Sequence, residues 1–173
     1  MIRRRHLRPC GTRAEVAYSG CGAFRYALTL RWADGPRLLW VMLNPSVAGE
    51  RANDPTIERC VRRSRALGYG AMRAVNLYAF RATRPADLFA AADPVGPLND
   101  AALRAARRWS DAVVLGWGVQ TPPHHAHALH TERTRLAHRL FRGAGCLGTT
   151  RGGHPRHPLY VPYSALPRPF DPD

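Results

Sequence analysis

The sequence contains no lysine, so all 26 of its basic residues are arginine. Acidic residues are scarce as well: 12 Asp and Glu leave a formal net charge of +14 on 173 residues. Arginine presents a planar fork of donors that binds phosphate or carboxylate through paired hydrogen bonds. A surplus of this size favours a polyanionic partner, and we expect nucleic acid. A GC-rich codon bias that leaves only a solvated basic surface is the alternative explanation.

Cysteine is rare and scattered along the chain. The four cysteines are Cys10, Cys21, Cys60 and Cys146, and no Cys-x-x-Cys pair occurs. This pattern argues against a disulfide scaffold, a zinc ribbon and an iron–sulfur site. We therefore expect reduced thiols, no bound metal and no cofactor.

Long apolar runs are also missing. No run approaches the ~20 residues that span a membrane. The basic segment "MIRRRHLRPCGTR" is not followed by the apolar stretch of a secretory signal. These absences predict a soluble, cytoplasmic protein without a membrane partner, and we expect it to be a monomer.

The chain has enough apolar residues, 45% of the total, to form a real core. Its length fits one domain, and no break in composition marks a second. We expect a single α/β domain over residues 1–173. Residues 1–20 are interpreted as a basic arm or a short leading strand, and residues 164–173 as a proline-rich tail.

Two strands are predicted near the start of this domain. Residues 24–32 alternate between apolar and polar, which is typical of a strand. Residues 37–43 form a continuous apolar run, as in a strand buried on both faces. The turn signals Asp-Gly and Gly-Pro lie between them, so we expect an antiparallel hairpin.

Helices and strands alternate after this hairpin. Asp54 can cap a helix that starts at Pro55, and Asn99 can cap a later one. The further expected elements are a helix at 55–67, a strand at 71–80, a helix at 100–109, a strand at 111–118, a helix at 126–142 and a strand at 144–150. This order predicts an α/β fold with a mostly parallel sheet and helices on both faces.

Polar residues follow the predicted strands at their carboxyl ends, where ligands bind in open α/β sheets. These residues are Asn44, Pro45 and Ser46 after the first core strand, Asn76 and Arg81 after the second, Trp117 after the third, and His154, Arg156 and His157 after the fourth. Together they predict one crevice at this edge of the sheet.

Asn44 has an amide that both donates and accepts hydrogen bonds, so it can hold an attacking water or a polar edge of a substrate. Pro45 stiffens the turn and keeps Asn44 out of a helical conformation. The alternative is a turn residue that bonds its own backbone. Asp54 is first of all a helix cap; it can also act as a base, or its helix can bind phosphate at the positive end.

Three of the other residues also have two interpretations each. Asn76 can bind the edge of a nucleobase or form a turn at the end of its strand. Arg81 can hold a phosphate or lie on the surface of a loop. Trp117 can stack on a base or belong to the core.

The closing segment "GGHPRHPL", residues 152–159, combines glycine, proline and two imidazoles. A neutral His154 or His157 can donate to an atom that gathers charge as a bond breaks. Arg156 can enter a DNA groove or contact phosphate. A surface loop with a fortuitous pair of histidines is the alternative interpretation.

Three histidines at a spacing of three, His124, His127 and His130, would share one helical face. Such a face can chelate a transition metal. No acidic residue or cysteine completes the set, so we expect a solvated face and no metal site.

As a set, these motifs resemble the bacterial family called Domain of Unknown Function 1643. The matching motifs are Met42-Leu43-Asn44-Pro45-Ser46, Asp54-Pro55-Thr56, Asn76-Leu77, Arg81-Ala82-Thr83, Gly116-Trp117-Gly118 and the segment 153–159. The resemblance covers roughly residues 20–163.

A more distant resemblance is to the uracil-DNA glycosylase superfamily, which implies a three-layer α/β/α sandwich. There, Asn44 would correspond to the asparagine that positions the attacking water. His154 or His157 would correspond to the closing-loop histidine that steadies the departing base, and Asn76 to a base-binding asparagine. The sequence departs from the superfamily at Met42, which stands where glycine is usual, and it lacks the carboxylate of the first motif.

The resemblance implies a hydrolase that breaks the N-glycosidic bond of a nucleobase in DNA. Two alternatives stay open. One is a nucleic-acid or nucleotide-binding module that keeps the fold without catalysis. The other is a nucleoside-type glycosidase that acts on a small metabolite.

Overall fold

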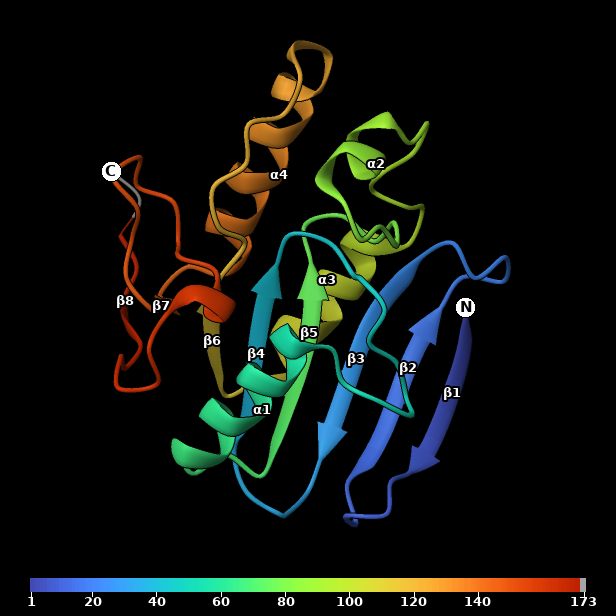
Figure 1. The fold of residues 1–173 in the computed structure, drawn as a ribbon, viewed down its shortest axis with the longest axis vertical. Helices are drawn as coiled ribbons and strands as arrows, with labels where there is room; N and C mark the ends of the chain where they lie inside the picture. The colour runs from blue at the N-terminus through green and yellow to red at the C-terminus, as the bar shows by residue number, and fades with distance from the viewer. Residues whose placement is uncertain (172–173) are drawn as a thin grey trace.

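The structure is a computed structural model that describes residues 1–171, built around one eight-stranded sheet (Figure 1). The strands are β1 (Ile2–Leu7), β2 (Arg13–Tyr18), β3 (Arg25–Arg31), β4 (Arg37–Met42), β5 (Ala71–Asn76), β6 (Ala112–Leu115), β7 (Gly145–Cys146) and β8 (Arg168–Pro169). The α-helices are α1 (Pro55–Ala66), α2 (Pro85–Ala90), α3 (Asn99–Trp109) and α4 (His127–Leu140). Two short 3₁₀-helices, η1 (His124–Ala126) and η2 (Pro158–Tyr160), lie in the connecting segments.

The order of the strands across the sheet is β1-β2-β3-β5-β4-β6-β7-β8. The pairs β4–β5, β4–β6 and β6–β7 are parallel, whereas β1–β2, β2–β3, β3–β5 and β7–β8 are antiparallel. The α/β class predicted from the sequence is therefore confirmed. The mostly parallel sheet is not, because antiparallel pairs are the more numerous over residues 1–171.

The predicted hairpin of residues 24–32 and 37–43 is wrong, because β5 lies between β3 and β4. The turn that joins β3 to β4 bends round Gly70, whose N–H donates to Pro36 O. A Cβ at Gly70 would lie only 2.6 Å from Asp34 O, so only glycine fits there. The turn is thus open enough to admit the start of a third strand, which a local turn signal does not reveal.

Residues 1–20 form β1 and β2 and are no loose arm. β2 pairs with β3 over its whole length, and its residue Val16 is fully buried. At the other end, the predicted proline-rich tail contributes β8, which pairs with β7 at residues 168–169. The last two residues of that tail lie outside the described part of the chain.

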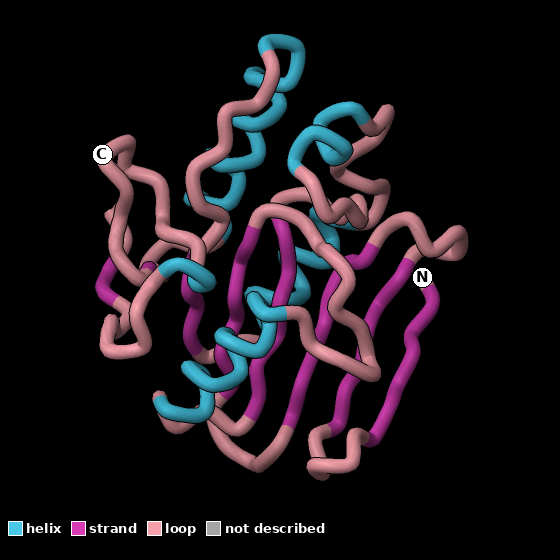
Figure 2. Tube along the Cα trace, in the orientation of Figure 1, coloured by secondary structure: helices cyan, strands magenta, loops and turns pink. Residues whose placement is uncertain are grey.

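Helices cover both faces of the sheet, as Figure 2 shows in cyan against magenta strands. On one face, Ile57, Cys60 and Val61 of α1 pack against Leu38 and Trp40 of β4 and their neighbours. On the other face, residues of α2, α3 and α4 pack on the opposite side of β4, β5 and β6. Since successive side chains of a strand point to opposite faces, the continuous apolar run of β4 supplies both cores.

The parallel strands β4, β5 and β6 all end at the same edge of the sheet, and the antiparallel strand β3 begins there. Backbone hydrogen bonds extend the pairing past the strands, since Tyr78 N donates to Leu43 O and Gly116 N to Val41 O. The segments that leave these strands are therefore held close together. Within residues 1–171, no helix combines the length and apolar character that a membrane span requires.

Candidate functional site

A cleft of about 740 Å³ opens at this edge of the sheet. Its walls come from five segments that are far apart in the sequence, and from one residue at the start of β3. The segments are residues 42–47 after β4, residues 54–57 at the start of α1, residues 82–85, residues 117–120 after β6, and residues 150–160. The volume lies within the range of about 300–1,000 Å³ that is usual for small-molecule sites. The cleft is the place where the chemistry-bearing residues of the sequence can meet a common ligand.

Six of the residues predicted for the site line this cleft: Asn44, Ser46, Asp54, Trp117, Arg156 and His157. Four others do not line it: Pro45, Asn76, Arg81 and His154. The crevice predicted at the strand ends therefore exists, but with a different set of residues.

Asn44 lies in the cleft with its amide held in one orientation. Its Nδ2 donates to Ala82 O at 2.7 Å and to Pro45 O at 3.2 Å. Pro45 itself is buried, and its carbonyl also accepts from Ala82 N, so it supports the loop and stays out of the cleft. The bonds of the nitrogen fix the orientation of the amide. Oδ1 has no protein partner within residues 1–171, so it can accept a hydrogen bond from a ligand.

His157 lies in the same cleft and is held in one tautomer. Leu159 N donates to its Nδ1 at 3.3 Å. Nδ1 is therefore an acceptor, so in the neutral ring the proton resides on Nε2. Burial lowers the pKa of His157, and the charge of Asp54 offsets part of that effect. At neutral pH the imidazole is thus an uncharged N–H donor.

Two glycines of the "GWG" motif allow the closing segment to approach the end of β6. Gly118 has a φ of +74°, and a Cβ there would lie 3.2 Å from the Cβ of His157. A Cβ at Gly116 would lie 3.0 Å from Pro158 Cδ. Gly118 N also donates to Pro155 O at 2.9 Å. The motif is therefore a docking place for the segment that carries His157.

Asp54 is the N-cap of α1, as the sequence predicts: its Oδ1 accepts from Ile57 N at 2.8 Å, and Pro55 occupies the first helical position. The side chain also lines the cleft. Only one carboxylate oxygen makes a hydrogen bond within residues 1–171, so the second one is available to a ligand. The capping role and a role in the cleft are compatible.

Trp117 is fully buried and lines the inner wall of the cleft. Its ring stacks on His138, with 5.6 Å between the centroids, and meets Phe170 edge-on. The core role of this residue is therefore confirmed, and stacking on a base stays a prediction.

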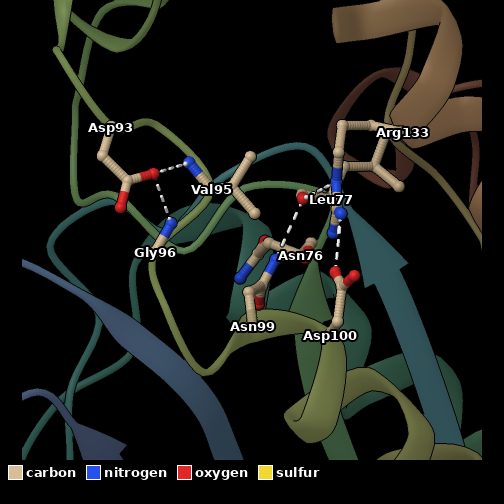
Figure 3. A network of polar contacts seen from close by, with 8 residues as sticks. All are labelled: Asn76, Leu77, Asp93, Val95, Gly96, Asn99, Asp100 and Arg133. Atoms are coloured by element: carbon tan, nitrogen blue, oxygen red, sulfur yellow. Dashed lines mark hydrogen bonds and ion pairs between the residues drawn. The ribbon is translucent and has the colours of Figure 1, made fainter.

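Asn76 was predicted to bind a ligand, but it is only 1% exposed and lies beneath the site. Figure 3 shows it in a network of polar contacts, where Asn99 Nδ2 donates to the backbone oxygens of Asn76 and Leu77. Arg133 donates to Leu77 O and forms an ion pair with Asp100 in the same network. The strand end is thus closed by α3 and α4, so the side chain of Asn76 does not reach the cleft.

Arg81 and His154 also lie elsewhere. Arg81 donates to Gly22 O and lies over the ring of Tyr18, outside the cleft. His154 does not line the cleft; its charge contributes to the lowered pKa values of His130 and His138 on α4, after the larger effect of their burial. Of the two closing-loop histidines, only His157 lines the cleft.

The sequence did not reveal Arg25, which also lines the cleft. The alternation of residues 24–32 suggested a solvent-facing side chain, yet Arg25 is only 2% exposed. It is buried because β3 begins under the loop that follows Asn44, where Nη1 donates to Ala48 O. No local pattern marks a residue that is covered by a loop twenty positions away.

An apolar rim surrounds the mouth of the cleft. Tyr160 is 77% exposed, Val47 70% and Val119 55%, and all three line the opening. Arg156 is also exposed there. Exposed apolar side chains that gather at one opening mark a binding site more strongly than isolated ones do. The position of Tyr160, directly after the closing motif, was a signal that the sequence offered.

The histidine series on η1 and α4 is not the uniform solvated face expected from the sequence. His124 and His127 are exposed, whereas His130 is buried and its Nδ1 lies 3.1 Å from Tyr78 Oη. Over residues 1–171, no group of three or more His, Cys, Asp or Glu side chains is placed to hold a metal ion.

One comparison with known proteins bears on the family. The model of a family described as "Protein of unknown function (DUF1643)" matches residues 25–159. This range contains every residue that lines the cleft except Tyr160. No curated protein and no solved structure shows significant similarity to the chain.

Proposed function

The chain belongs to the DUF1643 family, whose description assigns no activity, and from the geometry of its cleft we propose that it hydrolyses the N-glycosidic bond of a nucleobase in DNA. The observation that carries the proposal is the joint placement of Asn44 and His157. One presents an oriented acceptor to the cleft, and the other an oriented neutral donor.

The two side chains suit the two ends of the breaking bond. In hydrolysis, water adds to the anomeric carbon of the sugar while the bond to the base nitrogen breaks and its electron pair passes to the base. Oδ1 of Asn44 accepts a hydrogen bond from the water and orients it. Nε2–H of His157 donates to the base as negative charge develops on it.

Asp54 supplies the carboxylate that the first motif lacks. The residue is ten positions beyond Asn44, but the fold returns it to the same cleft. With one oxygen engaged as the helix cap, the other takes the proton of the attacking water as a general base.

The surroundings of the cleft fit a nucleic acid. A base must leave the helical stack before it can enter a cleft, which costs a few kcal/mol. Tyr160, Val47 and Val119 at the mouth give apolar surface against which bases can pack, and Arg156 gives a phosphate contact. The net charge of +14 favours the same partner. We further propose that the fold is related to that of the uracil-DNA glycosylase superfamily.

A panel of labelled oligonucleotides tests this function. The panel carries uracil, hypoxanthine, alkylated bases or mismatches, each in single- and double-stranded form. We expect the protein to leave alkali-labile abasic sites on at least one member. Asn44→Ala should lower that rate by about 10²- to 10⁴-fold, because an oriented water is lost. Asn53→Ala is the matched control, since Asn53 lies outside the cleft wall and bonds to Arg8 and Glu58.

A binding module without catalysis is the second candidate. Met42 favours it, because its buried side chain lies in the cleft wall where the superfamily usually has glycine. A salt-dependent gel shift without base release on any member of the panel would select this candidate and contradict the proposal.

A further inference from the structure

Arg25 is a buried cation without a carboxylate partner. It is 2% exposed and forms no ion pair within residues 1–171. The only hydrogen bond of its side chain there is the one from Nη1 to Ala48 O. Nε is buried without a partner, and Nη2 makes no hydrogen bond to those residues. Burying a charge that is not compensated is costly. The residue also lines the cleft, so a ligand can supply the missing acceptors.

Two other buried arginines have more acceptors than Arg25. Arg63 donates to three backbone carbonyls, those of Val161, Pro162 and Ala165. Arg133 donates to Leu77 O and pairs with Asp100 at 2.6 Å. Each of them also keeps one buried nitrogen without a partner, so Arg25 differs from them in having a single acceptor for its side chain and in lining the cleft.

A second feature of positive potential faces the same cleft. Helix α1 is 12 residues long, and the residues of its first turn, Pro55, Thr56 and Ile57, belong to the cleft wall. The N-terminal end of a helix carries a partial positive charge that favours anions. Asp54 opposes this potential in part. Burial lowers the pKa of Arg25 to about 10, and the charge of Asp54 counteracts that shift without forming an ion pair.

The position of Arg25 across the sheet indicates which part of a substrate it meets. Arg25 begins β3, Asn44 follows β4, and His157 lies against the end of β6. In the order β3-β5-β4-β6, the strand of Arg25 (β3) and the strand next to His157 (β6) are three strand spacings of ~4.8 Å apart, about 14 Å in all. A nucleotide that lies along this line places its base at His157, its anomeric carbon near Asn44, and its phosphate at Arg25.

We propose that the Arg25 end of the cleft binds the terminal phosphate of a nucleotide, so that the substrate is a phosphomonoester, either a free nucleotide or the end of a strand. This inference rests on the proposed function for the placement of the base. A guanidinium that is 2% exposed meets a phosphate that enters the cleft end-on. A phosphodiester inside a continuous strand carries a further nucleotide on each side, whereas a terminal phosphate can meet this buried guanidinium with none beyond it.

Titration calorimetry of the wild-type protein tests the phosphate site directly. The ligands are the 2′-deoxynucleoside 5′-monophosphates, the matching nucleosides and inorganic phosphate. We expect at least one monophosphate to bind about 10- to 100-fold more tightly than its nucleoside, as expected for hydrogen bonds to a charged group. Inorganic phosphate should compete with it, whereas chloride at equal ionic strength should not. Equal affinities for nucleotide and nucleoside, or no competition by phosphate, would overturn the proposal.

Variants assign the effect to Arg25. Arg25→Gln should remove the preference for the monophosphate, and Arg133→Gln, which also removes a buried arginine, should keep it. Asp54→Asn should tighten phosphate binding, because it removes the opposing charge. A folded Arg25→Gln protein with the preference intact contradicts the assignment; if that variant does not fold, the wild-type competition and the effect of Asp54→Asn decide the question.

The outcomes separate this inference from the proposed function. Base release from the interior of long duplexes without preference for terminal phosphates would end the phosphomonoester proposal and leave the glycosidase standing. Arg25-dependent nucleotide binding without base release from any substrate would keep the phosphate site and end the glycosidase.

Discussion

At the scale of single residues, the state of each polar atom decides what the cleft can do. Asn44 has its nitrogen engaged and its oxygen available, and His157 has one ring nitrogen engaged and the other protonated. In both cases a backbone group a short distance away fixes the orientation of the side chain. These two side chains therefore offer one acceptor and one donor in set positions, which is the preorganisation that the proposed hydrolysis needs.

Asp54 is expected to carry two separable roles, and two substitutions distinguish them. Asp54→Ala removes both the cap and the carboxylate, so it should lower the free energy of unfolding by about 1 kcal/mol and also abolish base release. Asp54→Ser keeps a capping oxygen and loses the charge, so it should retain most of the stability without the activity. Urea denaturation and the oligonucleotide assay measure the two effects. Full activity in a stable Asp54→Ser protein would restrict Asp54 to the cap.

The sequence located some of these residues and missed others for a physical reason. Asn44 and Asp54 were predictable because a buried strand ends at one and a helix begins at the other. Arg81 and His154 were wrongly predicted to face the cleft. The direction of a side chain beyond a strand end depends on how the loop turns, and the hydrophobic periodicity of the sequence does not contain that information. Arg25 was missed because a distant loop covers it. Local pattern thus finds the residues at element boundaries, and tertiary burial decides which of them face a ligand.

At the scale of elements, the closing segment depends on the "GWG" motif after β6. Gly118→Ala should destabilise the protein by about 1–3 kcal/mol, because the new Cβ meets both an unfavourable φ and the Cβ of His157. Gly143→Ala is the matched control, since Gly143 has a φ of +79° and nothing within 4 Å of an added Cβ. It should show the backbone cost alone, about 1 kcal/mol.

The same pair of variants also tests the position of His157. Gly118→Ala should reduce base release by more than its loss of stability accounts for, because it displaces the segment that holds the imidazole. Gly143→Ala should leave the rate unchanged. Denaturant titrations and rates measured on the folded proteins provide the comparison. Equal costs for the two variants would mean that the contact with His157 is not tight.

Some elements were predicted well from local signals, but the cap expected at Asn99 was wrong, because Leu98 is the N-cap of α3 and the Asn99 side chain donates to backbone oxygens of the strand end. Helix α1 begins at Pro55 with Asp54 as its cap, as expected, and the apolar run of residues 37–43 corresponds to β4. The pairing of strands was less predictable, because β5 enters between β3 and β4 from thirty residues further along the chain. Turn signals describe a bend in the backbone, but they do not show which strand will occupy the space beside it.

At the scale of the whole molecule, acid should destabilise the protein before its carboxylates titrate. Burial lowers the pKa of His130, His138 and His157 below the ordinary value of about 6.5. The unfolded chain then binds more protons than the folded one, so stability is fully present above pH 6.5 and declines as the pH falls toward the lowered values. Denaturant unfolding at pH 7.5 and 5.5 should show this loss.

His138→Phe should reduce that loss. Nε2 of His138 is buried without a partner, and the ring packs against Trp117 and Phe170. A phenyl ring fills the same space and cannot be protonated, so the variant should gain more stability at pH 5.5 than at pH 7.5. An unchanged difference between the two pH values would exclude His138 as a source of the acid sensitivity.

The outermost position of β1 also affects how copies of the chain meet one another. A strand at the border of a sheet leaves a row of backbone groups that a second molecule can extend into a fibril. Here that strand carries three consecutive exposed arginines, Arg3, Arg4 and Arg5, and the opposite border is the two-residue strand β8 with Pro169. At β1, repulsion between the arginines of two copies opposes pairing. At β8, the short strand and the missing N–H of its proline oppose pairing. Replacing the three arginines by valine would therefore turn a protected border into a template for aggregation.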